Sequence, residues 1–89
     1  MRVERLSRIV FTPLEDGAGV LLNLETQCYY NLNKTGASIW LGIEAKTPNS
    51  LDEIVTAICE QFDVAEDAAL IDTRAFLEHL ARFKMVRLV

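Results

Sequence analysis

The sequence lacks the residue groupings that catalysis usually needs. Its one histidine, His79, stands in a charged stretch and is expected to face solvent on a helix. No serine stands in a Gly-x-Ser-x-Gly setting, and neither a phosphate loop nor a dinucleotide-binding fingerprint occurs. Most acidic residues fall at expected helix starts or on expected solvent faces, where they suit capping. We therefore expect no enzymatic activity, no catalytic residue and no cofactor.

Cysteine is also scarce. Cys28 and Cys59 lie 31 positions apart, and no second cysteine or histidine stands at metal-ligand spacing from either of them. The pattern favours two buried free thiols over a disulfide or a zinc site. We therefore expect no bound metal ion.

Long apolar runs and clusters of basic residues are missing as well. No run is long enough to span a bilayer, and no apolar signal core follows the charged N-terminus, so we expect a cytoplasmic protein without a membrane partner. Nine Lys and Arg are scattered among thirteen Asp and Glu, which gives a net charge of −4. Nucleic-acid binding depends on clustered basic side chains that neutralise phosphates. The charge pattern therefore favours a neutral or basic peptide partner over a nucleic acid.

Apolar residues, in contrast, make up 51% of the chain. Eighty-nine residues of this composition can bury one modest core, so we expect a single domain over residues 1–89. β-branched and aromatic residues predict three strands, at residues 8–12, 18–24 and 28–32. We expect the last two strands to pair as an antiparallel hairpin. Residues 1–6 are interpreted as a polar lead-in.

Three helices are predicted after the strands. They span, in order, residues 34–45, 51–62 and 66–84, and a short extended segment follows at 85–89. Asn33 stands where its side-chain oxygen can cap the first helix. Ser50 and Glu53 form a capping box for the second helix. The third helix begins with acidic residues, which the helix dipole favours at that end.

A three-stranded antiparallel sheet followed by three helices describes an α+β domain that resembles a winged helix-turn-helix. A DNA-reading helix needs exposed basic or amide side chains that reach a groove. The third helix sets Arg74, Arg82 and Lys84 against four acidic residues within its own length. This balance argues against DNA reading, but a winged-helix DNA-binding protein stays an alternative.

Alternation of side chains along the strands predicts which residues share a face. In the second strand, the residues expected to face the core are Val20, Leu22 and Leu24. In the third strand, one face carries Cys28, Tyr30 and Leu32, and the other carries Tyr29 and Asn31. If the third strand lies at a sheet edge, its unpaired N–H and C=O groups can pair with another chain. The sequence does not fix which of its residues direct these groups outward.

The stretch at 32–40 reads Leu-Asn-Lys-Thr-Gly-Ala-Ser-Ile-Trp and follows a tyrosine-rich strand. Together with shorter matches at 20–22, 51–55 and 75–77, it resembles the PqqD-like family, also called RiPP recognition elements, over about residues 7–88. The resemblance implies a non-catalytic module that binds the leader of a ribosomally made precursor peptide. It also implies that the leader lies as an added antiparallel strand on the third strand, in a cleft beside the third helix.

The sequence differs at one turn from a well-known member of this family. Pyrroloquinoline-quinone (PQQ) synthesis protein D usually carries a Tyr-Pro-Glu-Gly turn before the third strand, whereas this sequence has Glu25-Thr26-Gln27. The chain is therefore more similar to the stand-alone leader-binding proteins of lasso-peptide biosynthesis. That similarity implies a leader peptidase or another modifying enzyme as a partner. The alternative within the family is a peptide chaperone for a radical-SAM enzyme in PQQ synthesis.

The resemblance and the strand pattern together select eight expected peptide-binding residues. From the third strand these are Tyr29, Tyr30, Asn31 and Leu32. From the third helix, whose turns are expected to wall the cleft, these are Leu70, Thr73, Arg74 and Leu77. Backbone pairing along the strand is expected to provide affinity, and side-chain pockets are expected to provide specificity.

Overall fold

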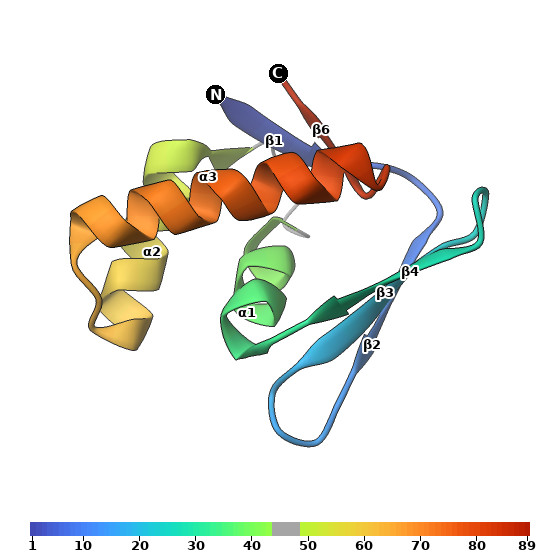
Figure 1. Cartoon of the computed structure of the whole chain (residues 1–89), viewed down its shortest axis with the longest axis horizontal. Coiled ribbons are helices and arrows are strands. Elements are labelled where there is room, and N and C mark those ends of the chain that lie inside the picture. Colours follow the sequence, from blue (N-terminus) through green and yellow to red (C-terminus); the bar gives the residue numbers. More distant parts are fainter. Residues whose placement is uncertain (44–48) are drawn as a thin grey trace.

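The computed structural model describes residues 1–43 and 49–89 (Figure 1). Within them the elements are, in order, β1 Arg2–Arg5, β2 Ile9–Pro13, β3 Gly19–Asn23, β4 Cys28–Leu32, α1 Lys34–Ile43, β5 Asn49–Ser50, α2 Leu51–Phe62, α3 Glu66–Arg82 and β6 Val86–Leu88. The three predicted strands and three predicted helices are confirmed, and their ends shift by at most two residues. Positions 44 and 45 of the first predicted helix lie outside the described residues.

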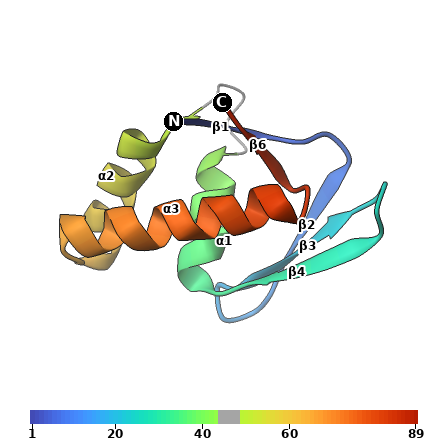
Figure 2. The same ribbon diagram turned by 45° about the horizontal axis from the view of Figure 1, so that its top comes forward.

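Strands β2, β3 and β4 form the predicted antiparallel sheet, in that order. Leu21 lies at its centre, opposite Phe11 on β2 and Tyr30 on β4, and is fully buried. The helices α1, α2 and α3 all lie on one side of this sheet (Figure 1 and Figure 2). The α+β class and the winged-helix-like arrangement are therefore confirmed.

The predicted core face of β3 is wrong. Leu21 is the buried leucine of this strand, whereas Val20 and Leu22 are half-buried on the opposite face. Leu24, which follows the strand, is 46% exposed. The face that carries Leu21 also carries Gly19 and Asn23, so the apolar count along the sequence favoured the other face.

Asn23 explains why the pattern misled. Its side chain is buried, and its Nδ2 donates a hydrogen bond to the Lys84 carbonyl at 2.8 Å. Its Oδ1 accepts from the backbone N–H of Glu25 at 2.8 Å and of Thr26 at 3.1 Å. A buried amide is tolerated when its hydrogen bonds are satisfied. Asn23 therefore joins the β3–β4 hairpin to the chain just after α3.

A second sheet, in the order β5-β1-β6, was not predicted. Residues 1–6 are not a polar lead-in, because β1 pairs antiparallel with both β5 and β6. Val3 is fully buried in the core, and Arg2 and Val89 exchange backbone hydrogen bonds of 2.9 Å. The extended segment predicted at 85–89 is confirmed as β6. The pairing joins the two ends of the chain, which no local pattern can indicate.

The predicted helix starts are confirmed. At α1, the Gly36 N–H donates to the Asn33 Oδ1 at 2.8 Å. At α2, the Glu53 N–H donates to the Ser50 Oγ at 3.2 Å, and the Ser50 N–H donates back to the Glu53 carboxylate at 3.4 Å. These side chains satisfy N–H groups that a helix leaves unpaired at its start.

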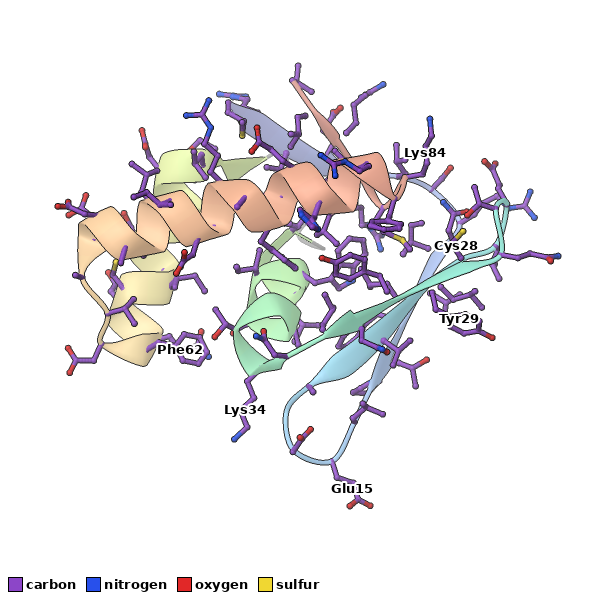
Figure 3. The ribbon with its side chains drawn as sticks, viewed as in Figure 1. Glu15, Cys28, Tyr29, Lys34, Phe62 and Lys84 are labelled. Carbon is purple, nitrogen blue, oxygen red and sulfur yellow. The ribbon has the colours of Figure 1, made fainter. Side chains whose placement is uncertain are left out.

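The two cysteines are free, as predicted, but they are not both buried. Cys59 is half-buried and Cys28 is exposed. Cys28 stands at the hairpin end of β4, where its Sγ lies 3.8 Å from the Thr26 carbonyl oxygen rather than in the core (Figure 3).

The core is built from both sheets and from all three helices. Its largest fully buried side chains are Trp40, Leu21, Leu77, Leu80, Met85 and Val3. Leu77 and Leu80 lie on the inner face of α3, which runs across α1 (Figure 2). Burial of side chains of this size provides most of the driving force for folding.

Truncation of Leu77 tests its place in this core. We expect Leu77→Ala to lower the free energy of unfolding by about 2–5 kcal/mol, because it removes a fully buried side chain and leaves a cavity. Ile71→Ala on the same helix is the control, since Ile71 is 68% exposed. The control should cost less than about 0.5 kcal/mol. Denaturant unfolding of both variants measures this, and equal losses would contradict the assignment.

Candidate functional site

The orientation of β3 follows from two backbone hydrogen bonds beyond its ends. The Leu24 N–H donates to the Arg8 carbonyl at 3.0 Å, and the Leu14 N–H donates to the Ala18 carbonyl at 2.9 Å. Both continue the β2–β3 register, so the even-numbered residues of β3 direct their N–H and C=O groups toward β2. Because successive residues alternate sides, the odd-numbered residues of β3 pair with β4.

The β3–β4 register then fixes the orientation of β4. The odd-numbered residues of β3 lie opposite Cys28, Tyr30 and Leu32, which therefore direct their backbone groups inward. Tyr29 and Asn31 direct their N–H and C=O groups toward the open edge of the sheet. The sequence did not fix which residues of this strand direct their backbone groups outward, and the register assigns Tyr29 and Asn31.

This edge of the sheet carries none of the usual protection. Edge strands are commonly blunted by charged side chains, proline or bulges. The residues of β4 are Cys-Tyr-Tyr-Asn-Leu, and their register with β3 is unbroken. The opposite edge differs, because Pro13 stands on the outward side of β2 and has no N–H to offer. Strand β4 is therefore the edge of this sheet better suited to pairing.

A groove runs between β4 and α3. The Tyr30 ring packs edge-to-face against Phe76, at a centroid distance of 6.3 Å, and against Phe83 at 5.5 Å. Beside these rings lies a concavity of about 400 Å³. Its lining is Tyr30, Asn31, Leu32, Asn33 and Phe76. The open edge of β4 therefore borders a partly aromatic groove.

A second pocket of about 400 Å³ continues the groove past the start of α1. It shares Asn33 and Phe76 with the first concavity, and α2 and α3 supply apolar walls that include Phe62 and Ala69. Asp72 adds a carboxylate to this lining. Gly36 keeps α1 close to α3, because a Cβ there would stand 3.2 Å from the Phe76 ring. The pocket can hold an apolar side chain near a negative charge.

Three of the four site residues predicted on the strand, Tyr30, Asn31 and Leu32, line this groove. Tyr30 and Leu32 direct their side chains toward α3 and the core, and Leu32 is buried. Asn31 is exposed at the rim. Tyr29 is 70% exposed, and its ring points away from α3 (Figure 3).

The four site residues predicted on the helix are not all brought to the groove. Leu77 is fully buried, and Thr73 lines the second pocket from a buried position. Leu70 and Arg74 are exposed but lie about 120° and 160° around the helix from Phe76. Their side chains therefore stand on the other flank of α3. The structure corrects the expectation that Leu70, Arg74 and Leu77 wall the cleft.

Phe76 and Asp72, which the sequence analysis did not select, also line the groove, and Phe83 packs against Tyr30 beside it. Phe76 and Phe83 stand seven residues apart, so they lie on nearly the same line of the helix. Both are aromatic residues of the third predicted helix, and their aromatic character at this spacing is a signal that could have selected them. Asp72 lies about 40° from Phe76 around the helix, and no pattern in the sequence marks it.

The described residues show neither a metal site nor a membrane span. No group of three His, Cys, Asp or Glu residues among them is placed to hold a metal ion. None of the helices in the described ranges is long and apolar enough to cross a bilayer.

An open sheet edge beside a side-chain groove is the arrangement by which β-augmentation domains bind extended peptides. Residues 18–86 match the family of coenzyme PQQ synthesis protein D (PqqD). The chain belongs to this PqqD family of RiPP recognition elements. Among curated proteins, no match is found.

Two solved structures share the fold. One is TbiB1 in complex with the TbiA(beta) leader peptide, with a TM-score of 0.84 and 30% identity over 97% of this chain and 96% of that chain. The other is a lasso peptide synthetase B1 complexed with the leader peptide, with a TM-score of 0.79 and 20% identity over 99% of this chain and 100% of that chain.

Proline substitutions test the assigned orientation of β4. We expect Tyr29→Pro and Asn31→Pro to fold with nearly unchanged stability, because these N–H groups point away from β3. Tyr30→Pro removes an inward N–H and should be less stable than Tyr30→Ala by about 1–3 kcal/mol. The alanine variant controls for loss of the ring contacts. Thermal melts followed by circular dichroism give the order, and a reversed order would contradict the assignment.

Proposed function

We propose that this protein binds the leader of a ribosomally made precursor peptide as an added antiparallel strand on β4. We further propose that it presents the precursor to a separate leader peptidase in lasso-peptide maturation. The observation that carries the proposal is the unprotected edge at Tyr29 and Asn31, which borders the groove beside Phe76. Similarity over nearly the whole chain to TbiB1, solved with a leader peptide, supports it.

The backbone of β4 provides the affinity in this proposal. Tyr29 and Asn31 each offer one N–H and one C=O to the incoming strand. Each hydrogen bond contributes a net of about 0.5–1.5 kcal/mol, because water must first leave both partners. These bonds do not depend on the peptide sequence. Discrimination among peptides must therefore come from side chains.

The groove provides the specificity. Alternate side chains of an added strand point toward α3 and lie against the aromatic rings of Tyr30 and Phe76. The second pocket, farther along the same groove, accepts an apolar side chain. Asp72 at this pocket favours a peptide that carries a positive charge nearby. Binding of this kind requires no chemistry from the chain, so the proposed role is not enzymatic.

The alternatives from the sequence are less well supported. A peptide chaperone in PQQ synthesis would use the same edge of β4, but the hairpin Glu25-Thr26-Gln27 lacks the turn usual for that protein. A winged-helix DNA-binding protein would need a basic surface on α3. The exposed Arg74 and Arg82 of α3 alternate instead with exposed acidic residues such as Glu78.

Measuring leader affinity in variants of α3 tests whether the leader contacts the flank that borders the groove or the opposite flank. The probe is a fluorescent leader from the precursor encoded in the same gene cluster, titrated by anisotropy. Phe76→Ala and Asn31→Pro should each weaken binding about tenfold, close to the loss of one good interaction. Arg74→Ala is the control on the far flank and should leave affinity unchanged. If only Arg74→Ala weakens binding, the groove is assigned to the wrong side of α3.

Salt dependence distinguishes a peptide partner from DNA. The nine Lys and Arg are scattered among thirteen Asp and Glu, so the sequence offers no basic cluster to neutralise phosphates. We therefore expect leader binding to change little with added salt and random duplex DNA to bind negligibly at about 0.15 M salt. Titrations of both probes at two salt concentrations measure this. Micromolar DNA binding that falls steeply with salt would favour the DNA-binding alternative.

A further inference from the structure

Charge is distributed unevenly along the groove between β4 and α3. Residues 49–73, which include α2 and the first part of α3, carry seven of the thirteen acidic residues and no Lys or Arg. The second pocket is lined by residues of these two helices, and Asp72 is the charged residue in its lining. This pocket shares Asn33 with the first concavity, so it lies at the Leu32 end of β4. That end of the groove is therefore negative.

The other end of the groove has the opposite sign. It lies at the hairpin end of β4, where Cys28 stands opposite Asn23 (Figure 3). The Lys84 carbonyl accepts from the Asn23 side chain at 2.8 Å, and the Arg8 carbonyl accepts from the N–H of the residue after β3 at 3.0 Å. The side chains of Lys84 and Arg8 are exposed, and the hairpin turn itself adds one acidic residue, Glu25.

Asp72 presents a free carboxylate at the negative end. It is exposed, and it precedes Phe76 by about 6 Å along the helix axis. Its carboxylate forms no ion pair or hydrogen bond with another residue in the described ranges. Lys34, at the start of α1, points away from α3, and its side chain lies beside Gly17 of the β2–β3 turn (Figure 3). Asp72 can therefore accept a cation from a bound peptide.

We propose that Asp72 fixes the direction and register of the bound leader by pairing with a Lys or Arg on the N-terminal side of the docked strand. The inference rests on the proposed leader binding at β4. An antiparallel leader has its N-terminal part at the Leu32 end of β4, beside Asp72. Its C-terminal part lies at the Cys28 end, beside Lys84. The leader should therefore be basic before the docked strand and not after it.

Backbone pairing and aromatic packing do not by themselves set direction or register. The N–H and C=O groups of Tyr29 and Asn31 can pair with a parallel or an antiparallel strand of any sequence. A slip by two residues turns the same set of side chains toward α3, so the aromatic rings alone permit it. Such a slip moves the leader by about 7 Å and takes its cation away from Asp72.

The geometry also gives the position of the cation in the leader. The 6 Å that separate Asp72 from Phe76 are close to two residues of an extended strand, at about 3.3 Å each. Residues two apart in a strand share a face. The basic residue should therefore stand about two positions N-terminal to the leader residue that packs against Phe76. Because the pair is exposed, it should raise affinity by up to about fivefold and add only a shallow salt dependence.

The test is a charge swap, measured by anisotropy with the fluorescent leader from the precursor encoded in the same gene cluster. Amide hydrogen exchange first locates the docked strand on the leader. Asp72→Lys should weaken binding about tenfold or more, because it replaces an attraction by a repulsion. Glu78→Lys is the matched control, since it makes the same charge change at an exposed residue on the opposite flank of α3. It should leave affinity within about twofold.

Leader variants supply the rescue. Replacement of the Lys or Arg N-terminal to the docked strand by Glu should weaken binding to the unaltered chain about tenfold, and Asp72→Lys should restore most of that loss. A Glu introduced C-terminal to the docked strand should not gain affinity from Asp72→Lys. Asp72→Asn removes the charge and keeps the shape, and it should cost up to about fivefold. It replaces Asp72→Lys if melts show that the latter unfolds.

The outcomes are separable. Equal affinities of folded Asp72→Lys and Glu78→Lys overturn the inference but leave leader binding at β4 intact, and so does a leader without Lys or Arg N-terminal to the docked strand. Rescue of the C-terminal Glu instead of the N-terminal one means that the leader runs in the opposite direction, which also overturns the inference. If the unaltered chain does not bind the leader, the proposed function fails, and this inference fails with it.

Discussion

The packing of Tyr30 against Phe76 and Phe83 is the contact on which the rest of the site depends. It fixes the distance between β4 and α3, and so it gives the groove its floor. It also uses the inner face of β4 for packing while the inward backbone groups pair with β3. The outward backbone groups of Tyr29 and Asn31 are then left for another chain. This five-residue strand therefore uses one set of backbone groups for the fold, and its other set faces the open edge of the sheet.

The parts of the fold that were predictable from sequence are those set by neighbours along the chain. Caps at Asn33 and Ser50 act over three residues, so their helices begin where expected. The β5-β1-β6 sheet was missed because its strands pair across the full length of the chain. Asn23 misled the assignment of the β3 face, because its hydrogen bond to the Lys84 carbonyl joins residues 61 positions apart and forms only in the folded protein. A sequence pattern shows which side chains are polar. Whether a polar side chain is buried depends on whether residues far away in the sequence satisfy its hydrogen bonds.

For the candidate site, too, only features set by neighbours along the chain were predictable from sequence. The tyrosine-rich strand was selected from alternation and from its position before a helix cap, which are local properties, and the structure places this strand at an edge of the sheet. Which of its residues face outward depended on how β2 pairs with β3, and that required the register. On α3, helical periodicity groups residues into faces but does not indicate which flank of the helix meets β4. Phe76 was therefore left out of the predicted site, and Arg74, on the opposite flank, was included.

The backbone hydrogen bonds that Arg2 and Val89 exchange hold the two ends of the chain side by side. The first and last residues are neighbours in β1 and at the end of β6, across α3 from β4 (Figure 1). A short linker could join them without breaking a strand pair, and new ends could then be opened in the exposed turn around Glu15. The order of the elements along the chain would change while the contacts between them stayed the same. A circularly permuted chain should therefore keep the fold, because the groove depends on the contacts between the elements and not on where the chain begins.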